Sequence, residues 1–199
     1  MQSFWFPGEK NDRHRYAAKE CFQLHFSNKS DKVITDKYLS WFEKLEGGLL
    51  ENWRNDHDGR LAYCIICDQF SRNMFRGQAR AFSQDSKAFE LAMSIVDDPK
   101  KMKCYRNHEK MFILLPLLHC ESIDAINRAI EGFDKGIKDC DAQGNMGFRK
   151  LFVISKSFGI AHKEPVEKFG RYPGRNKALG RDNTPEETAW LVNAPSWAK

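Results

Sequence analysis

The sequence predicts an all-α protein, an irregular array of about eight helices packed as helical hairpins. Apolar residues recur at three- and four-residue spacings along most of the chain, and the alternation typical of strands is nearly absent. Cap residues, glycines and prolines stand where these helical patterns begin and end. The 199 residues are 41% hydrophobic and contain no linker rich in proline, glycine or serine, so we expect a single domain over residues 1–199.

The N-terminal half predicts three helices. Residues 12–26 have one apolar face, and residues 31–45 follow with Asp31 as a cap, a stripe that runs from Val33 to Leu45, and a stop at Gly47-Gly48. A short piece at 49–53 and a polar turn at 55–59 precede the most apolar pattern, RLAYCIICDQF at 60–70. Its CxxC lies inside an apolar run, so we interpret both cysteines as core residues and expect reduced thiols rather than disulfides.

The C-terminal half continues the helical pattern. Residues 79–96 form one predicted helix that ends at Asp97-Asp98-Pro99, and residues 108–119 are apolar nearly all round, as in a central helix. Residues 122–138 are amphipathic, 141–145 form a loop, and 148–169 are helical, with Pro165 opening a fresh turn or a kink. Thr184-Pro185-Glu186-Glu187 combines a cap, a first-turn proline and acids, which predicts the start of the last helix.

Composition excludes several classes of protein. The net charge is +5, and the cations interleave with acids instead of forming the unopposed stripe of a nucleic-acid-binding protein. The apolar runs are far shorter than the roughly 18–20 residues of a bilayer span, and the N-terminus lacks a basic-then-apolar leader. We therefore expect a soluble cytoplasmic protein without nucleic-acid or membrane partners. No spacing indicates a cofactor or a metal, and the oligomeric state is not readable from the sequence.

Three polar clusters interrupt the helical patterns. The first cluster, residues 68–82, follows the most apolar helix, and Asp68 and Arg72 are four apart, as in a pair on one helix face. One interpretation is a corner between helices, locked by an Arg–Asp pair; the other is a set of ligand contacts. The candidate ligand-binding residues of this cluster are Asp68, Gln69, Arg72, Asn73, Arg76 and Arg80.

The second cluster, residues 117–122, places His119 and Glu121 at the end of an apolar helix. Their spacing is not the i, i+4 of a helical zinc site. Either His119 interacts with the helix C-terminus while Glu121 or Ser122 caps the next helix, or His119 is a general acid or base in a pocket.

The third cluster, residues 169–181, holds three glycines and has four cations and no acid from position 171 onward. Glycines allow close approach of the backbone, so a phosphate, carboxylate or sulfate is the expected guest. Alternatively, its arginines bind helix C-terminal carbonyls and the acids of the first cluster. The candidate ligand-binding residues here are Arg171, Arg175, Asn176 and Arg181.

Taken in order, FWF at 4–6, DQFSRN at 68–73, RAF at 80–82, HCE at 119–121, FGRYPGRN at 169–176 and LGR at 179–181 resemble the DUF924 family. The family pattern is roughly FWFG, LDQFPRN, RAF, HSE, H, FGRFPHRN, LGR and TPEE, and the match runs from Phe4 to about Leu191. The resemblance implies an all-α fold similar to tetratricopeptide-type helical-hairpin arrays in a soluble intracellular protein, and it implies no activity. It places His162 at the family's isolated histidine. The chain departs from the family at Ser71, Cys120 and Gly174, and Gly174 replaces a loop histidine, which favours binding over catalysis.

These observations support three hypotheses. The leading one is a pocket for an anionic small molecule or an anionic peptide end, lined by Arg72, Arg171, Arg175 and Arg181. The second is a hydrolase or transferase in which His119 or His162 is the acid–base group, oriented by Glu121 or Asp68. The third is a scaffold that presents a groove between helical hairpins to a partner peptide.

The hypothesis of a pocket makes a geometric prediction, because unpaired charges beside apolar helices are costly to bury. The three clusters should converge in space, with Asp68 or Glu121 within salt-bridge reach of Arg171, Arg175 or Arg181.

Overall fold

The computed structural model describes residues 2–6 and 28–198, and every regular element in them is helical, which confirms the all-α fold. The α- and π-helices are α1 (Gln2–Trp5), α3 (Asp31–Glu46), α4 (His57–Cys64), a π-helix (Ile65–Phe70), α5 (Ser71–Met74), α6 (Asp85–Val96), α7 (Pro99–Lys103), α8 (Asn107–Leu118), α9 (Ile123–Ala142), α10 (Met146–Phe169) and α11 (Pro185–Asn193). Short 3-10 turns lie at Asn28–Ser30, Glu51–Asn55, Ala79–Phe82, Pro173–Arg175 and Ser196–Ala198.

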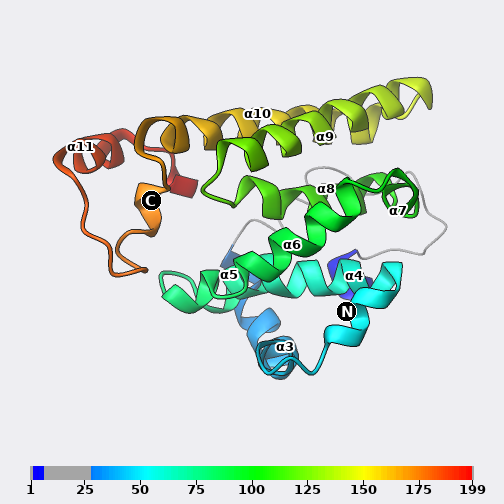
Figure 1. Cartoon of the computed structure of the whole chain (residues 1–199), viewed down its shortest axis with the longest axis horizontal. Helices are drawn as coiled ribbons and strands as arrows, with labels where there is room; N and C mark the ends of the chain where they lie inside the picture. Colours follow the sequence, from blue (N-terminus) through cyan, green and yellow to red (C-terminus); the bar gives the residue numbers. More distant parts are fainter. Residues whose placement is uncertain (1, 7–27, 199) are drawn as a thin grey trace.

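The helices are arranged in layers. The hairpin of α9 and α10 forms one side of the molecule, α8 and α6 lie beneath it, and α4, α5 and α3 form the opposite side (Figure 1). The segment after α10, with α11, occupies one end, next to the end of α5 (Figure 1). One hydrophobic core runs through these layers from Trp5 to Tyr172. The tetratricopeptide-like arrangement and the single domain stay predictions.

Helix α8 is the centre of the core, as its apolar composition predicted. Its residues from Met111 to Leu118 are all buried, because α8 packs against α6, α9, α10 and α4. The helix ends beneath the hairpin, and His119 is the residue that caps it. His119 therefore lies where the core helix α8 meets the polar site.

The hairpin of α9 and α10 depends on close packing at a glycine. Cβ placed on Gly136 would lie 2.7 Å from the ring of Phe152, which is itself buried. The turn between the two helices contains Gly144, whose φ of 66° favours glycine, and Asn145 caps α10. Ser122 caps α9 in the same way, as one of the interpretations from the sequence expected.

Several expected boundaries were wrong. The helix expected at 60–70 begins at His57 and continues through the π-helix to Met74, because the first polar cluster is itself helical. The helix expected at 79–96 is a 3-10 turn followed by α6, and α7 after Asp98 was missed. Val33 is 40% exposed rather than part of the apolar stripe. Helix α10 is continuous through Pro165.

Other expectations were confirmed. Cys64 and Cys67 are fully buried in the core and are free thiols, whereas Cys104 is exposed. The N-cap of α11 is Thr184, which forms a capping box with Glu187.

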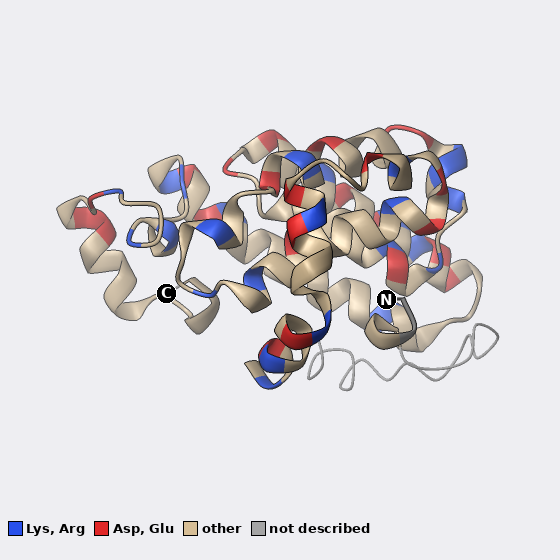
Figure 2. Ribbon diagram, turned by 90° about the horizontal axis from the view of Figure 1, so that it is seen from below, with Lys and Arg blue, Asp and Glu red and all other residues tan. Residues whose placement is uncertain are grey.

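Lys and Arg are intermixed with Asp and Glu over the described ribbon (Figure 2). The helix expected at 12–26, with Cys21, lies outside the described residues, and none of the described helices is long and apolar enough to cross a membrane.

Candidate functional site

The site begins at the π-helix Ile65–Phe70, which joins α4 to α5 within one continuous helical run. A π-turn inserts one extra residue into the helix and shifts the side chains that follow it. All six of its residues are buried, including Asp68 and Gln69. The π-helix therefore places a carboxylate inside the protein at the edge of the core, next to the end of α8.

Asp68 is 1% exposed and is held by groups from the end of α8, from α5 and from the π-helix itself. Its carboxylate lies 2.6 Å from Nδ1 of His119, 3.1 Å from the guanidinium of Arg72 and 2.5 Å from the amide of Gln69. Burial by itself would raise the pKa of Asp68, but the charges of Arg72 and His119 and the hydrogen bonds it accepts outweigh burial and lower the pKa well below 3.8. Asp68 is thus a buried, ionised group.

A second carboxylate, Asp85 at the start of α6, binds two arginines. Arg72 donates to both oxygens of Asp85 at 2.9 Å, and Arg175 lies 3.4 Å from the same carboxylate. Arg175 also donates to the carbonyl of His119 at 2.8 Å. Its guanidinium lies over the rings of both Phe82 and Tyr172. This network joins the first, second and third clusters.

Arg72, His119 and Arg175 of this network line a cavity of about 640 Å³. The lining combines arginine and amide side chains of the first cluster and Arg175 of the third with apolar side chains of α8 and α10. The cavity is lined by Gln69, Arg72, Asn73, Arg76, Gly77, Phe82, Met111, Leu115, Leu118, His119, Leu151, Ile154, Ser155, Phe158, His162, Tyr172, Pro173, Gly174, Arg175, Trp190, Ser196, Trp197 and Ala198.

Two histidines line this cavity, and each has its Nδ1 atom fixed. Because the carboxylate of Asp68 is ionised, Nδ1 of His119 donates to it. Nδ1 of His162 donates to the carbonyl of Phe158 at 2.8 Å, since a carbonyl can only accept. Burial lowers the pKa of both histidines, to about 3 for His162, and the nearby positive charges of Arg72 and Arg175 act in the same direction. Both rings are therefore neutral at pH 7.

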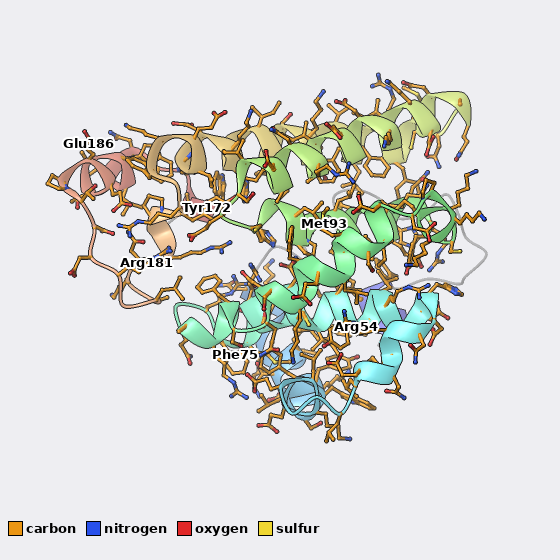
Figure 3. All side chains as sticks on the ribbon, in the orientation of Figure 1. Arg54, Phe75, Met93, Tyr172, Arg181 and Glu186 are labelled. Atoms are coloured by element: carbon orange, nitrogen blue, oxygen red, sulfur yellow. The ribbon has the colours of Figure 1, made fainter. Side chains whose placement is uncertain are left out.

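The third cluster folds back over the second, as the pocket hypothesis predicted. Arg181 donates to both oxygens of Glu121 at 2.8 and 2.9 Å, and the same carboxylate accepts from the backbone of Tyr172 at 2.8 Å. The hydroxyl of Tyr172 donates to the carbonyl of Leu118. Tyr172 and Arg181 lie on the segment between α10 and α11 (Figure 3). The predicted convergence of the three clusters is confirmed.

Six of the predicted site residues are not among the described residues that line the cavity. Arg171 and Asn176 bind the buried carboxylate of Glu187, Arg181 binds Glu121, and Arg80 binds Glu46 of α3 over the ring of Phe75. Asp68 lies behind His119 and Arg72. The expectation that Arg171 and Arg181 form the charged wall is corrected: Arg181 binds Glu121, one of the predicted pairings, and Arg171 binds Glu187, which was not predicted. The residue that orients His119 is Asp68 and not Glu121.

Sequence reasoning missed four contributors to the site. Asp85 and Phe82 both lie within residues 79–96, which were predicted to form one helix, and neither was among the candidate site residues. Tyr172 was read as part of an anion-binding loop, yet its hydroxyl and backbone hold that loop in place. Trp197 comes from the last turn, and its indole stacks on His162 with ring centroids 3.8 Å apart. An aromatic residue so close to the end of the chain was the one available signal for Trp197.

Comparisons with known proteins give a fold and a family but no activity. No curated protein matches the chain. Among solved structures, the protein of unknown function ATU0120 from Agrobacterium tumefaciens is similar, with 27% sequence identity, a TM-score of 0.66 and coverage of 83% of this chain and 85% of that one. The family described as bacterial protein of unknown function, DUF924, matches residues 1–194. Because that match covers nearly the whole sequence, the chain belongs to the DUF924 family.

Proposed function

We propose that the cavity binds a small organic anion that has an apolar portion. One observation carries the proposal: the charged side chains among the described lining residues are those of Arg72, Arg76 and Arg175. The described lining also includes neutral histidines but no carboxylate. The acids that balance them, Asp31, Asp68 and Asp85, lie behind the arginines. A wall of this kind presents positive charge to the cavity while the arginines remain partnered.

Arg175 is the residue best placed to meet the ligand. Its side chain is 15% exposed, its contact with Asp85 is 3.4 Å long, and its second donor goes to a backbone carbonyl. A guanidinium has five N–H donors in a fixed fork, so Arg175 keeps donors for a carboxylate or phosphate oxygen. The stacking of its guanidinium on Phe82 and Tyr172 holds the fork in one orientation.

The apolar lining residues indicate the chemistry of the rest of the ligand. Leu115, Leu118, Leu151, Ile154 and Phe158 present an apolar surface to the same cavity. The volume of about 640 Å³ corresponds to about twenty water molecules at the roughly 30 Å³ each occupies in the liquid. The ligand is therefore a metabolite-sized molecule with an anionic end and a hydrocarbon or aromatic end.

Calorimetric titration of the protein with a panel of aliphatic and aryl carboxylates and alkyl phosphates tests this function. We expect at least one member to bind, and we expect Arg175→Gln to weaken that binding by about tenfold or more, since a charge-assisted hydrogen bond contributes roughly 1.5–3 kcal/mol. Arg149→Gln is the matched control, because Arg149 pairs with Asp141 on the surface of the hairpin. If none of the anions binds at millimolar concentration, or if both variants bind equally well, the proposal is wrong.

A second candidate function, hydrolysis or group transfer on such an anion, is favoured by the pair Asp68–His119. A buried carboxylate on Nδ1 leaves Nε2 of the imidazole as a base toward the cavity, which is the arrangement of many general-base histidines. A panel of carboxylate and phosphate esters measures this activity, with His119→Ala as the comparison. Equal turnover in both proteins removes His119 from any mechanism.

A further inference from the structure

We infer that the ligand is a hydroxylated organic anion, whose hydroxyl group donates to the free Nε2 atom of His119 or His162 while its anionic group meets the arginines. The inference rests on the proposed function and names the ligand class of the same cavity. It is carried by the hydrogen bonds of the two histidines, which determine what each ring can offer a ligand.

His119 offers an acceptor. Its Nδ1–H is used by the carboxylate of Asp68 at 2.6 Å, and its backbone carbonyl is used by Arg175. The side chain is 16% exposed and lines the cavity. With Nδ1 as the donor, Nε2 of the neutral ring is the atom left to interact with a ligand, and it carries a lone pair rather than a proton.

His162 of α10 offers a second acceptor. Its Nδ1–H is used by the carbonyl of Phe158, one turn earlier in α10. The ring is held between the indole of Trp197, which stacks on it at 3.8 Å with an interplanar angle of 10°, and the edge of Tyr172. The ring of His119 lies 6.1 Å away between centroids. A hydroxyl group near the two rings, which has one proton, can therefore donate to Nε2 of either one.

The groups that face these rings keep them as acceptors. His119 faces one acid, Asp68 on the π-helix, and its neighbour His162 on α10. It also faces two arginines, Arg72 on α5 and Arg175 on the loop after α10. Both arginines pair with Asp85 of α6, which lies behind them. His162 faces His119, Tyr172, Arg72 and Arg175. A second proton on either ring would meet two guanidinium charges in a buried site. Burial and these charges lower the pKa of both rings, and for His119 they outweigh Asp68, which acts in the opposite direction.

This arrangement discriminates between anions. An unsubstituted carboxylate satisfies the arginines but leaves Nε2 unpaired, or places oxygen lone pairs against the nitrogen lone pair. A hydroxyl group supplies the missing donor, and a site with fixed polar groups rejects the analogue that lacks the matching group. An ammonium group would supply a donor as well, but its charge would lie beside Arg72 and Arg175 and be repelled.

The test uses pairs of anions that differ by one hydroxyl group: lactate with propionate, mandelate with phenylacetate, and glycerol 3-phosphate with propyl phosphate. Affinities are measured by calorimetry at pH 7.5. We expect the tightest binder to be hydroxylated and to bind about threefold to tenfold more tightly than its partner, as for one neutral hydrogen bond. We expect His162→Phe, which keeps a flat ring against Trp197, or His119→Phe to abolish that preference while the unsubstituted partner binds as before. His57→Gln, on the surface, is the control.

The outcomes separate the two proposals. If unsubstituted anions bind the unmodified protein as tightly as their hydroxylated partners, or if both phenylalanine variants keep the preference, the hydroxyl inference is overturned and anion binding stands. If no member of any pair binds at millimolar concentration, both proposals are overturned. His119→Phe removes one of the three partners of Asp68 and can impair folding. The comparison of hydroxylated with unsubstituted anions on the unmodified protein therefore decides the test even if that variant does not fold.

Discussion

Asp68 is the residue on which the polar site depends. Its carboxylate, 1% exposed, accepts from His119, Arg72 and Gln69, so its charge is compensated from both sides. Removing one member of a buried charged network leaves the others without compensation, which costs more than the pair itself contributes. The arrangement therefore makes Asp68 a determinant of stability as well as of the orientation of His119.

Replacing Asp68 by Asn is expected to destabilise the fold by on the order of 3 kcal/mol, because Arg72 loses a buried opposite charge and Nδ1 of His119 loses its ionised acceptor. Urea unfolding followed by circular dichroism measures the change. Asp36→Asn is the control: Asp36 is 58% exposed and pairs with Lys32 on the surface, so its loss should change the free energy of unfolding by less than about 0.5 kcal/mol. Similar values for the two variants would contradict the role given to Asp68.

Trp197 is expected to hold the pKa of His162 down. Its indole covers one face of the ring at 3.8 Å, and burial is the largest cause of the pKa of about 3. In Trp197→Ala, water reaches the ring, and the pKa should rise toward the ordinary 6.5. The NMR titration of the His162 ring protons measures it, with His57 as an internal reference. An unchanged pKa of His162 would show that the ring is shielded by other groups.

At the scale of elements, the hairpin of α9 and α10 is a second determinant of the site, because α10 carries His162 and much of the apolar wall. The two helices approach closely where Gly136 meets the ring of Phe152. A buried aromatic ring has little freedom to move away from an added methyl group. The glycine is thus required by packing and not by backbone conformation.

Gly136→Ala is expected to destabilise the protein by about 1–3 kcal/mol through overpacking against Phe152. Gly147→Ala is the opposite case: it lies in the first turn of α10, where an added Cβ comes no closer than 3.9 Å to Asn145. There the gain in helix propensity predicts a stabilisation of about 0.5–1 kcal/mol. Thermal and urea unfolding of both variants measure the two signs; a stable Gly136→Ala protein would refute the close packing.

At the scale of the molecule, polar contacts organise the end that holds α11. Arg181 joins this end to Glu121, and within it Arg171 and Asn176 bind Glu187, which also accepts from the backbone of Thr184. Few residues of α11 belong to the core, in contrast to α8. Parts of a protein with few buried apolar contacts open at lower cost than its core.

Acid is therefore expected to release this end first. The hydrogen bond with Arg171 is the largest cause that lowers the pKa of Glu187 from 4.5 to about 2. Since the folded-state pKa is the lower one, the charge of Glu187 stabilises the fold above pH 4.5, and this stabilisation is lost as the pH falls toward 2. The indole N–H signal of Trp190 in α11 should change in this range before those of Trp41 and Trp53 at the opposite side. In Glu187→Gln the early change should disappear; simultaneous changes in all three signals would contradict the prediction.

The sequence by itself determined the helices and much of their order. Apolar spacing placed α3, α8, α9 and α10 within a few residues, and Thr184-Pro185-Glu186-Glu187 marked α11, because periodicity and capping are local properties of the chain. The balance of charges also identified the convergence of the three clusters, since buried charges require partners wherever the chain places them. These inferences needed no knowledge of how the helices pack.

Only the tertiary structure decided which polar residues face the cavity. Arg171, Arg175 and Arg181 are alike in the sequence, yet the first and last bind Glu187 and Glu121 and only Arg175 lines the cavity. Asp85 and Trp197 reach the site from α6 and from the last turn, far away along the chain. The π-helix that positions Asp68 has no sequence signature, because its extra residue is stabilised by the packing around it. Pairing between distant side chains depends on the three-dimensional path of the backbone, which local patterns do not specify.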